Sequence, residues 1–286
     1  MKTNANLSHP PFKDTCGRER AFTFTDLLVV MATLAILAAL ILPALARSGD
    51  NGMRTVCLNN LRQMGMALNM YVGENQDTMP WVNWGSDNPA PAGWLYHPTA
   101  NMPNNLQQGL ISDTANWPTG RVDNLKTGVY WQYLQNPDVF MCPVDAAANV
   151  GTATWDVRNN KLSTYVMNGA SAFFPALSPA NMYGYRTCKM SQIWSPSCII
   201  QWEPAGNSGA GNGYNDGANY PTSSEGPSIA LHGTGGNVLT VGGSARVMSL
   251  TEITAEMNHP LKGVAIQGKG LFWWNPITRD GHGQLY

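Results

Sequence analysis

The segment Ala21–Ala46 reads AFTFTDLLVVMATLAILAALILPALA, and Asp26 is its one charged residue. From Leu27 to Ala46 no charged side chain interrupts the apolar run. An α-helix rises ~1.5 Å per residue, so this run has about the ~30 Å length of a bilayer's hydrocarbon core. The segment therefore predicts a membrane-spanning helix over 27–46.

The flank before this segment predicts its orientation. Residues 1–20 carry more basic than acidic side chains, namely Lys2, Lys13, Arg18 and Arg20 against Asp14 and Glu19. Basic residues next to a membrane span tend to stay on the cytoplasmic side. We therefore expect the N-terminus inside and everything after Arg47 on the export side.

Hydropathy leaves three fates open for the apolar segment. A secretory signal peptide would be cut after Ala46, although the run is longer than the ~7–15 apolar residues of such signals. An uncut single-pass anchor would keep the whole N-terminus. A prepilin signal would be cut before the apolar run, so that the helix stays on the mature protein. Hydropathy alone favours the uncut anchor.

The residues FTFTDLLVV at 22–30 resemble the N-terminal signature of type IV pilins and type II secretion pseudopilins. This resemblance favours the prepilin signal. It implies that a prepilin peptidase cuts after Ala21 and methylates the new amine of Phe22. It also implies that Asp26 is the acidic position of the signature and Pro43 the helix-kinking proline. Two departures are Ala21, where the family usually has Gly, and Asp26, where it usually has Glu.

The acidic side chain of Asp26 needs a partner in an apolar helix. A carboxylate at mid-membrane costs ~2.5–3.5 kcal/mol on insertion scales. The resemblance supplies a partner, the amine of Phe22 in a neighbouring subunit, and two charges ~4 Å apart attract by ~4 kcal/mol at an effective dielectric of ~20. We expect Asp26 to set the subunit register during assembly. The open alternative places Asp26 at the headgroup level, in contact with water.

Helical periodicity returns after Arg47. Apolar residues recur at three- and four-residue steps, at Met53, Val56, Cys57, Leu61, Met64, Leu68 and Tyr71. We predict one long helix over 22–75 with a soft or unwound joint near 49–52, where weak helix formers gather. The predicted organisation is a leader over 1–21, this helix, and a globular head over 76–286.

The head has short apolar runs separated by Gly, Asn and Pro. Strands are predicted over 128–134, 162–167, 198–202, 237–241 and 244–248. Gly242-Gly243 separates the last two and suits a two-residue hairpin turn, while 206–227 is expected to be one long loop. The prediction is an α+β fold in which the long helix packs on an antiparallel sheet with large loops.

Several further segments are similar to the large pseudopilin-like proteins of the "H-X9-DG" group. They are residues 57–65, 71–80, 140–145, 163–168 and 232–243. The hallmark of the group is a His, nine residues, then Asp-Gly. Here His232 is followed by Gly242-Gly243, so the aspartate is absent. We expect His232, Gly242 and Gly243 to form a structural turn in which the His bonds the turn backbone.

The cysteines fit no CxxC zinc or thioredoxin spacing, and they are Cys16, Cys57, Cys142, Cys188 and Cys198. Loss of the leader leaves an even number, which suits disulfides in an oxidising compartment. Four buried thiols are the alternative. Because the resemblance covers Cys57 and Cys142, we expect that pair and the pair Cys188–Cys198. A Cys57–Cys142 bridge would add ~4 kcal/mol in the chain-entropy model.

Charge and motifs limit the function classes. Charged residues make up 12% of the chain, against about 25% in typical soluble proteins, and the net charge is −1. No basic face for phosphates is indicated, so we expect no nucleic-acid partner. The sequence has no GxSxG, HExxH, P-loop or dinucleotide motif, so we predict neither an enzyme nor a cofactor. Cys142 with His232 has the residue types of a nucleophile pair, but we expect a disulfide cysteine.

Two ligand hypotheses concern the head. Oxygen ligands for calcium are available, without EF-hand spacing, at Asn212, Asn215, Asp216 and Glu225. A surface for stacking sugars is available at Trp81, Trp84 and Trp94. We expect a solvated loop and aromatic packing instead, and no bound metal.

These features predict a structural subunit of a type II secretion pseudopilus or a type IV pilus-like filament. The expected location is the bacterial inner membrane, with a cytoplasmic N-terminus and a periplasmic head. Expected partners are prepilin peptidase, other pilin-like subunits, the inner-membrane assembly platform and the lipid bilayer. The alternatives are a membrane-anchored module that captures polysaccharide without polymerising, and a secreted hydrolase released after Ala46.

Overall fold

The computed structural model of the whole chain describes two units, Met1–Ser48 and Gly49–Tyr286. The described residues are 23–84, 90–98, 119–174, 186–205, 213–214, 216–229, 231–233, 235–258 and 270–274, with the side chains of 41–51 excepted.

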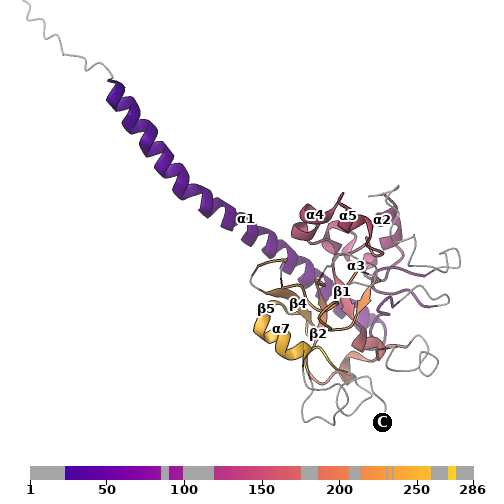
Figure 1. Cartoon of the computed structure of the whole chain (residues 1–286). Helices are drawn as coiled ribbons and strands as arrows, with labels where there is room; N and C mark the ends of the chain where they lie inside the picture. Colours follow the sequence, from indigo (N-terminus) through magenta and orange to yellow (C-terminus); the bar gives the residue numbers. More distant parts are fainter. Residues whose placement is uncertain are drawn as a thin grey trace, which may run out of the picture. The chain divides into compact units, whose positions relative to one another are not determined.

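Helix α1 runs from Phe24 to Glu74 (Figure 1). The long helix predicted over 22–75 is therefore confirmed within the described residues. The predicted unwound joint is wrong, because α1 is helical throughout Gly49–Gly52. The boundary between the two units falls at Ser48/Gly49, so the weak helix formers mark a change of tertiary surroundings.

The first turn of α1 is closed by a reciprocal cap between Thr23 and Asp26. The Thr23 amide and Oγ1 donate to Asp26 Oδ2 at 2.9 and 2.8 Å, and the Asp26 amide donates to Thr23 Oγ1 at 3.2 Å. Such a capping box satisfies amides that have no partner inside the helix. An acidic side chain in the first turn also interacts favourably with the helix dipole.

The first unit exposes its apolar side chains along α1. Every residue from Thr23 to Leu40 is exposed within this chain. Among the described residues, no helix combines the length and the apolar character that crossing a membrane requires. The span predicted over 27–46 has described side chains only as far as residue 40.

The second unit contains a five-stranded sheet in the order β3-β1-β2-β4-β5. The strands are β1 Val166–Asn168, β2 Ile199–Trp202, β3 Ala218–Asn219, β4 Gly236–Thr240 and β5 Ala245–Met248. Three of the pairings are antiparallel, but β1 and β3 are parallel. The α+β class is confirmed and the all-antiparallel sheet is corrected to a mixed one, because the segment 206–227 contributes β3 to the edge.

The strand predicted over 128–134 is wrong. This segment forms a turn and then helix α3, Trp131–Leu134. The amides of Val129 and Tyr130 donate to the carbonyls of Gly93 and Trp94, which fixes the segment against another loop rather than the sheet. Gln135, with φ of 47°, ends the helix in the left-handed region. Local apolar content predicted a strand, and tertiary contacts override that propensity.

The hairpin of β4 and β5 is confirmed, with one residue more in its loop than predicted. Gly243 N–H donates to Thr240 O, and Thr240 N–H donates to Ser244 O, so the loop is residues 241–243. Gly243 has a φ of +83°, the left-handed conformation that three-residue hairpin loops need at this place. Glycine adopts it without a Cβ clash.

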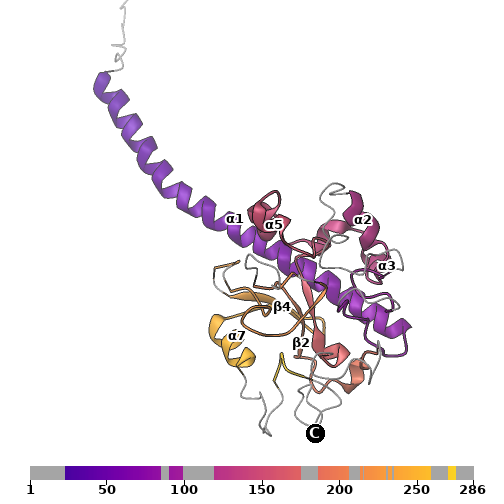
Figure 2. The ribbon, with the colours of Figure 1, turned by 45° about the vertical axis from the view of Figure 1, so that its right-hand side comes forward.

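Several short helices accompany the sheet in the second unit (Figures 1 and 2). They are α2 Thr119–Leu125, α4 Pro143–Asn149, α5 Ala153–Asp156 and α7 Leu250–Met257, with 3₁₀ turns at Pro137–Phe140, Gly169–Ala172 and Met190–Gln192. Within the second unit, α2, α3 and α5 lie on one side of α1 (Figure 2), and α7 lies beside β4 and β5 (Figure 1).

The head half of α1 supplies one wall of the core. Cys57, Leu61, Met64 and Leu68 are fully buried, at the three- and four-residue steps that the sequence predicted. Close packing is possible at Gly65, where an added Cβ would lie 2.9 Å from Leu239 Cδ1 and 3.2 Å from the Cα of Gly243 in the hairpin loop. The stripe therefore fixes α1 against β4 and its turn.

Candidate functional site

Four chemically reactive side chains meet in the core of the second unit. They are Cys57 on α1, Cys142 at the start of α4, Glu203 directly after β2, and His232 in the loop before β4. One ligand atom of each lies within 4.8 Å of all the others. We call these residues the Cys-His-Glu cluster. Cys57 and Cys142 belong to segments of the H-X9-DG resemblance, 57–65 and 140–145, and His232 is the hallmark histidine.

The contacts within the Cys-His-Glu cluster are short. The sulfurs of Cys57 and Cys142 lie 2.8 Å apart. His232 Nε2 lies 3.8 Å from Cys142 Sγ and 2.8 Å from Glu203 Oε2. The side chain of His232 is 2% exposed and that of Glu203 is 0% exposed. The cluster is therefore closed to solvent in this structure.

Burial and pairing determine the protonation of the cluster. Burial by itself would lower the pKa of His232, but its contacts with Cys142 and Glu203 outweigh burial and raise this pKa to about 9. Burial, with the contact to Cys57, raises the pKa of Cys142 far above its ordinary value. At neutral pH these shifts favour a protonated His232 imidazole beside a neutral Cys142 thiol.

The cluster does not have the geometry of a Cys–His–acid nucleophile system. In such a system one ring nitrogen faces the nucleophile and the other is held by the acid. Here the same nitrogen, Nε2 of His232, faces both Cys142 and Glu203. The raised pKa of Cys142 also disfavours the thiolate that a nucleophile requires.

Two polar side chains, those of His232 and Asn237, contact Glu203 through Oε2. Asn237 Nδ2 donates to Glu203 Oε2 at 3.0 Å, and Asn237 Oδ1 accepts from Arg54 Nε at 3.4 Å. Arg54 Nη2 also donates to Gly235 O at 3.3 Å. No described residue donates a hydrogen bond to Glu203 Oε1, although this atom is buried.

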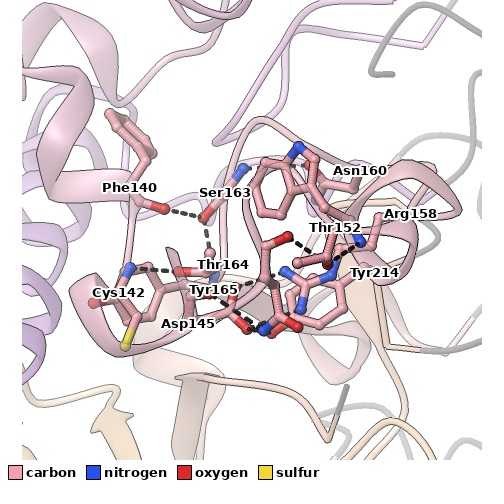
Figure 3. A network of polar contacts seen from close by, with 12 residues as sticks. Phe140, Cys142, Asp145, Thr152, Arg158, Asn160, Ser163, Thr164, Tyr165 and Tyr214 are labelled. Atoms are coloured by element: carbon pink, nitrogen blue, oxygen red, sulfur yellow. Dashed lines mark hydrogen bonds and ion pairs between the residues drawn. The ribbon is translucent and has the colours of Figure 1, made fainter. Parts of the chain in front are cut away.

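A second buried network lies around Asp145, as Figure 3 shows. Arg158 Nη1 and Nη2 donate to the two oxygens of Asp145 at 2.6 and 2.8 Å, and both side chains are almost fully buried. The guanidinium also lies 3.7 Å from the ring centroid of Tyr214. Such a bidentate pair stacked on an aromatic ring is a rigid arrangement. It fixes helix α4 to the segment that follows α5.

The segments of the H-X9-DG resemblance bind one another directly (Figure 3). The Cys142 amide donates to Thr164 Oγ1 at 2.6 Å, and Ser163 Oγ donates to Phe140 O at 3.0 Å. Asn60 on α1 donates through Nδ2 to Met141 O at 3.0 Å. Motifs that lie up to 81 residues apart in the sequence are therefore hydrogen-bonded to one another around Cys142.

A family model described as "Protein of unknown function (DUF1559)" matches residues 54–197, which is about half of the chain. The chain belongs to the DUF1559 family. This family is associated with the H-X9-DG pilin-like proteins. No curated protein and no solved structure matches the chain. The match begins at Arg54, beyond the residues that carry the prepilin resemblance, and it ends before Glu203 and His232.

The predicted disulfides are absent from the DUF1559 chain as the structure describes it. Cys57, Cys142, Cys188 and Cys198 are all thiols. Cys57 and Cys142 are neighbours, as the resemblance implied, but 2.8 Å exceeds the ~2.05 Å of an S–S bond. Cys188 and Cys198 are buried, and Cys16 lies outside the described residues.

The predicted structural turn divides into two places in the DUF1559 chain. His232 contacts Glu203 and Cys142 in the cluster, whereas Gly242 and Gly243 form the β4–β5 loop. Gly242 occupies the position of the hallmark aspartate, and an added Cβ there would lie 3.0 Å from the Pro196 side chain. Packing against Pro196 therefore leaves little room for a side chain at this position.

The predicted processing and assembly residues are only partly described. Ala21 and Phe22 lie outside the described residues. Asp26 is exposed and caps α1 through Thr23. Pro43 lies within α1, in the stretch whose side chains are not described.

The two ligand hypotheses for the head are weakened by the structure. Trp81 and Trp94 are buried in the core, and Trp84 is partly buried against Tyr220 at 4.5 Å between ring centroids. These rings therefore do not form an exposed stacking surface. Of the calcium candidates, the carboxylates at 216 and 225 each accept a backbone N–H, and residues 212 and 215 lie outside the described part of the chain.

Sequence reasoning missed Glu203. No motif surrounds it, and it follows the apolar strand β2 as an acidic residue at a strand end. The available signal was an acidic residue next to the all-buried run Ile199–Trp202, because buried carboxylates require partners. That signal does not identify His232 as the partner, 29 residues later in the sequence.

Proposed function

We propose that this DUF1559 chain is a pilin-like structural subunit that is anchored in the bacterial inner membrane and assembles through α1. The supporting observation is the apolar surface of α1 before residue 41. Its large apolar side chains are between 44% and 75% exposed, and they are Phe24, Leu27, Leu28, Val29, Val30, Met31, Leu34, Ile36, Leu37 and Leu40. A contiguous apolar surface of this kind indicates contact with lipid or with another protein.

The apolar surface surrounds the helix on all sides, which favours lipid as the first environment. Leu27, Leu28, Val29 and Val30 are consecutive and all exposed, so they point in every direction around α1. A helix that packs against one partner protein has an apolar stripe instead. We therefore infer that the segment lies in the bilayer before assembly, with the head on the periplasmic side.

The head half of α1 also keeps an apolar face that the head does not cover. Val56, Met66 and Met70 are 47%, 58% and 52% exposed. At 100° per residue their directions fall within about 80° of one another, so they form one stripe. We propose that this stripe contacts neighbouring subunits in a pseudopilus or pilus-like filament.

The proposal gives Asp26 a role in assembly, whereas the structure shows Asp26 as part of the cap of α1. Its Oδ2 accepts two hydrogen bonds from Thr23 in the capping box. We propose that the carboxylate also pairs with the amine of Phe22 of a neighbouring subunit after cleavage by prepilin peptidase. Capping and assembly are separable, because Thr23 is needed only for the cap.

The test compares Asp26→Asn with Thr23→Val in cells that produce the assembly machinery. Pairs of residues on α1 are replaced by cysteine, and the fraction of subunits crosslinked to one another is measured in intact cells. The proposal predicts a severalfold loss of crosslinked subunits for Asp26→Asn and near-normal crosslinking for Thr23→Val. Equal losses for the two variants would assign Asp26 to helix capping alone, and no loss for Asp26→Asn would remove its assembly role.

A further inference from the structure

The Cys-His-Glu cluster has the composition of a metal site. We infer that Cys57, Cys142, Glu203 and His232 bind one transition-metal ion, with Zn²⁺ as the best-fitting ion. This inference does not rest on the proposed pilin-like function, because all four residues lie in the core of the second unit. It concerns how that core is held together.

The donor atoms select the class of ion. Two sulfurs, one imidazole nitrogen and one carboxylate oxygen are the ligand types that zinc accepts in tetrahedral sites. Calcium and magnesium require oxygen ligands, so two sulfurs exclude them. The spacing of 57, 142, 203 and 232 contains no CxxC pair, which is why the sequence alone does not reveal the site.

The sulfur separation lies between the values for a disulfide and for a zinc site. Two thiolates on a tetrahedral zinc with ~2.3 Å bonds lie about 3.8 Å apart. The observed 2.8 Å therefore requires Cys57 and Cys142 to separate by about 1 Å, which rotation about their side-chain bonds can supply. A disulfide would require the sulfurs to approach instead. The sulfur separation alone does not distinguish these two outcomes.

Glu203 and His232 decide in favour of a metal. A disulfide between Cys57 and Cys142 would use neither of them, although both are buried beside the two sulfurs. A metal ion would use all four side chains, and a carboxylate oxygen would coordinate it. Nε2 of His232 already faces both Cys142 and Glu203, as a shared central ion requires.

The charge balance and the hydrogen bonds around the Cys-His-Glu cluster also fit a bound Zn²⁺. Two thiolates and the Glu203 carboxylate carry three negative charges, and Zn²⁺ with the neighbouring guanidinium of Arg54 supplies three positive ones. Arg54 reaches the site through Asn237, which donates to Glu203 Oε2 and accepts from Arg54 Nε. Such outer-shell hydrogen bonds orient metal-binding carboxylates. On binding, the two thiols release their protons and the imidazole binds in its neutral form.

A site with four protein ligands leaves no open position, so its role would be structural. Its ligands come from α1, the start of α4, the end of β2 and the loop before β4. One ion would therefore join the head half of α1 to three other segments of the head. Metal binding would add directly to the free energy of folding.

The test uses the full chain, purified in detergent under reducing conditions and stripped with a chelator. It is exposed to Zn²⁺, freed of excess ion and measured by elemental mass spectrometry. A second sample receives Co²⁺, whose thiolate complexes absorb in the near ultraviolet. The inference predicts one zinc per chain, a thiolate–cobalt band, and a higher melting temperature with Zn²⁺ than with chelator.

Variants locate the ion. Cys142→Ser and Glu203→Gln should lose the thiolate–cobalt band or weaken zinc binding at least tenfold. Cys188→Ser is the matched control, because Cys188 is equally buried but lies outside the cluster, and it should retain one zinc. Wild-type protein that binds no zinc would overturn the inference whether or not the variants fold. Protein isolated from the periplasm with a Cys57–Cys142 disulfide would overturn it too.

Discussion

The two parts of α1 differ in what covers their apolar side chains. Between Phe24 and Leu40 the large apolar residues are exposed, whereas Leu61, Met64 and Leu68 are fully buried. Both parts are helical, but the first is apolar on all sides, whereas the second also carries polar residues such as Arg54, Asn59 and Arg62. The head covers one face of the second part, and nothing in the described chain covers the first. The comparison separates the part of α1 that the head buries from the part whose apolar side chains remain exposed.

The largest expected effect comes from the buried ion pair of the head. Asp145→Ala removes the partner of Arg158 and leaves a buried guanidinium without its carboxylate. We expect the free energy of unfolding to fall by about 3–5 kcal/mol. The control is Asp123→Ala, which breaks an exposed pair with Lys126 and should cost at most about 1 kcal/mol. Urea denaturation measures the free energy of unfolding of both variants. Equal losses would contradict the claim that the Asp145–Arg158 pair is buried and the Asp123–Lys126 pair is exposed.

Leucine truncations test the comparison within α1 itself. Leu61→Ala should destabilise the head by about 2–5 kcal/mol, because it opens a cavity in the core. Leu34 is 56% exposed, so Leu34→Ala in detergent should leave unfolding of the head within about 0.5 kcal/mol of wild type. Tryptophan fluorescence follows this transition, since all ten tryptophans lie after residue 80. If Leu34→Ala destabilised the head as much as Leu61→Ala does, the two parts of α1 would not be independent.

Glycine substitutions measure how closely α1 packs on the hairpin. An alanine at Gly65 meets Leu239 and the Gly243 backbone, so Gly65→Ala should destabilise by about 1–3 kcal/mol. Gly73 has nothing within 4 Å of an added Cβ, so Gly73→Ala should stabilise the helix by about 0.5–1 kcal/mol. Opposite signs in thermal melts are the expected result. If Gly65→Ala left the stability unchanged, the β4–β5 hairpin would have to move to make room for the added methyl group.

The smallest effect concerns the cap of α7. Ser249 Oγ accepts from the Glu252 amide, and the Glu252 carboxylate accepts from the Ser249 amide. These bonds hold the pKa of Glu252 below its ordinary 4.5, so its stabilisation is present above pH 4.5 and is lost as the pH falls through the folded value. Ser249→Ala should cost about 1 kcal/mol at neutral pH. The stability difference between Ser249→Ala and wild type should become smaller in acid. Thermal melts over a pH series measure it, and a difference that grows as the pH falls would contradict the prediction.

Much of the fold follows from local patterns. The period of Leu61, Met64 and Leu68 predicted the buried stripe of α1, and glycines between two apolar runs predicted the β4–β5 hairpin. These succeed because helix and strand periods are set by residues near in sequence. The segment 128–134 failed because hydrogen bonds to Gly93 and Trp94 decide its conformation.

The candidate site was predicted only in part. The resemblance brought Cys57 and Cys142 together, and it marked His232 as a residue of interest. It did not place these three in one cluster, and Glu203 had no motif at all. Four ligands from separate segments meet only through the tertiary fold, so no spacing in the sequence encodes them. The choice between disulfide and metal likewise depends on Glu203 and His232, which only the tertiary fold brings to the two sulfurs.

The central claim is that the first part of α1 stays on the mature protein and is covered by lipid and then by other subunits. The most direct test is the N-terminal residue of the chain extracted from inner membranes, read by sequencing and by intact mass. Cleavage before the apolar run predicts Phe22 as the first residue. A mature chain that begins at Arg47 and remains monomeric in buffer without detergent would contradict the account.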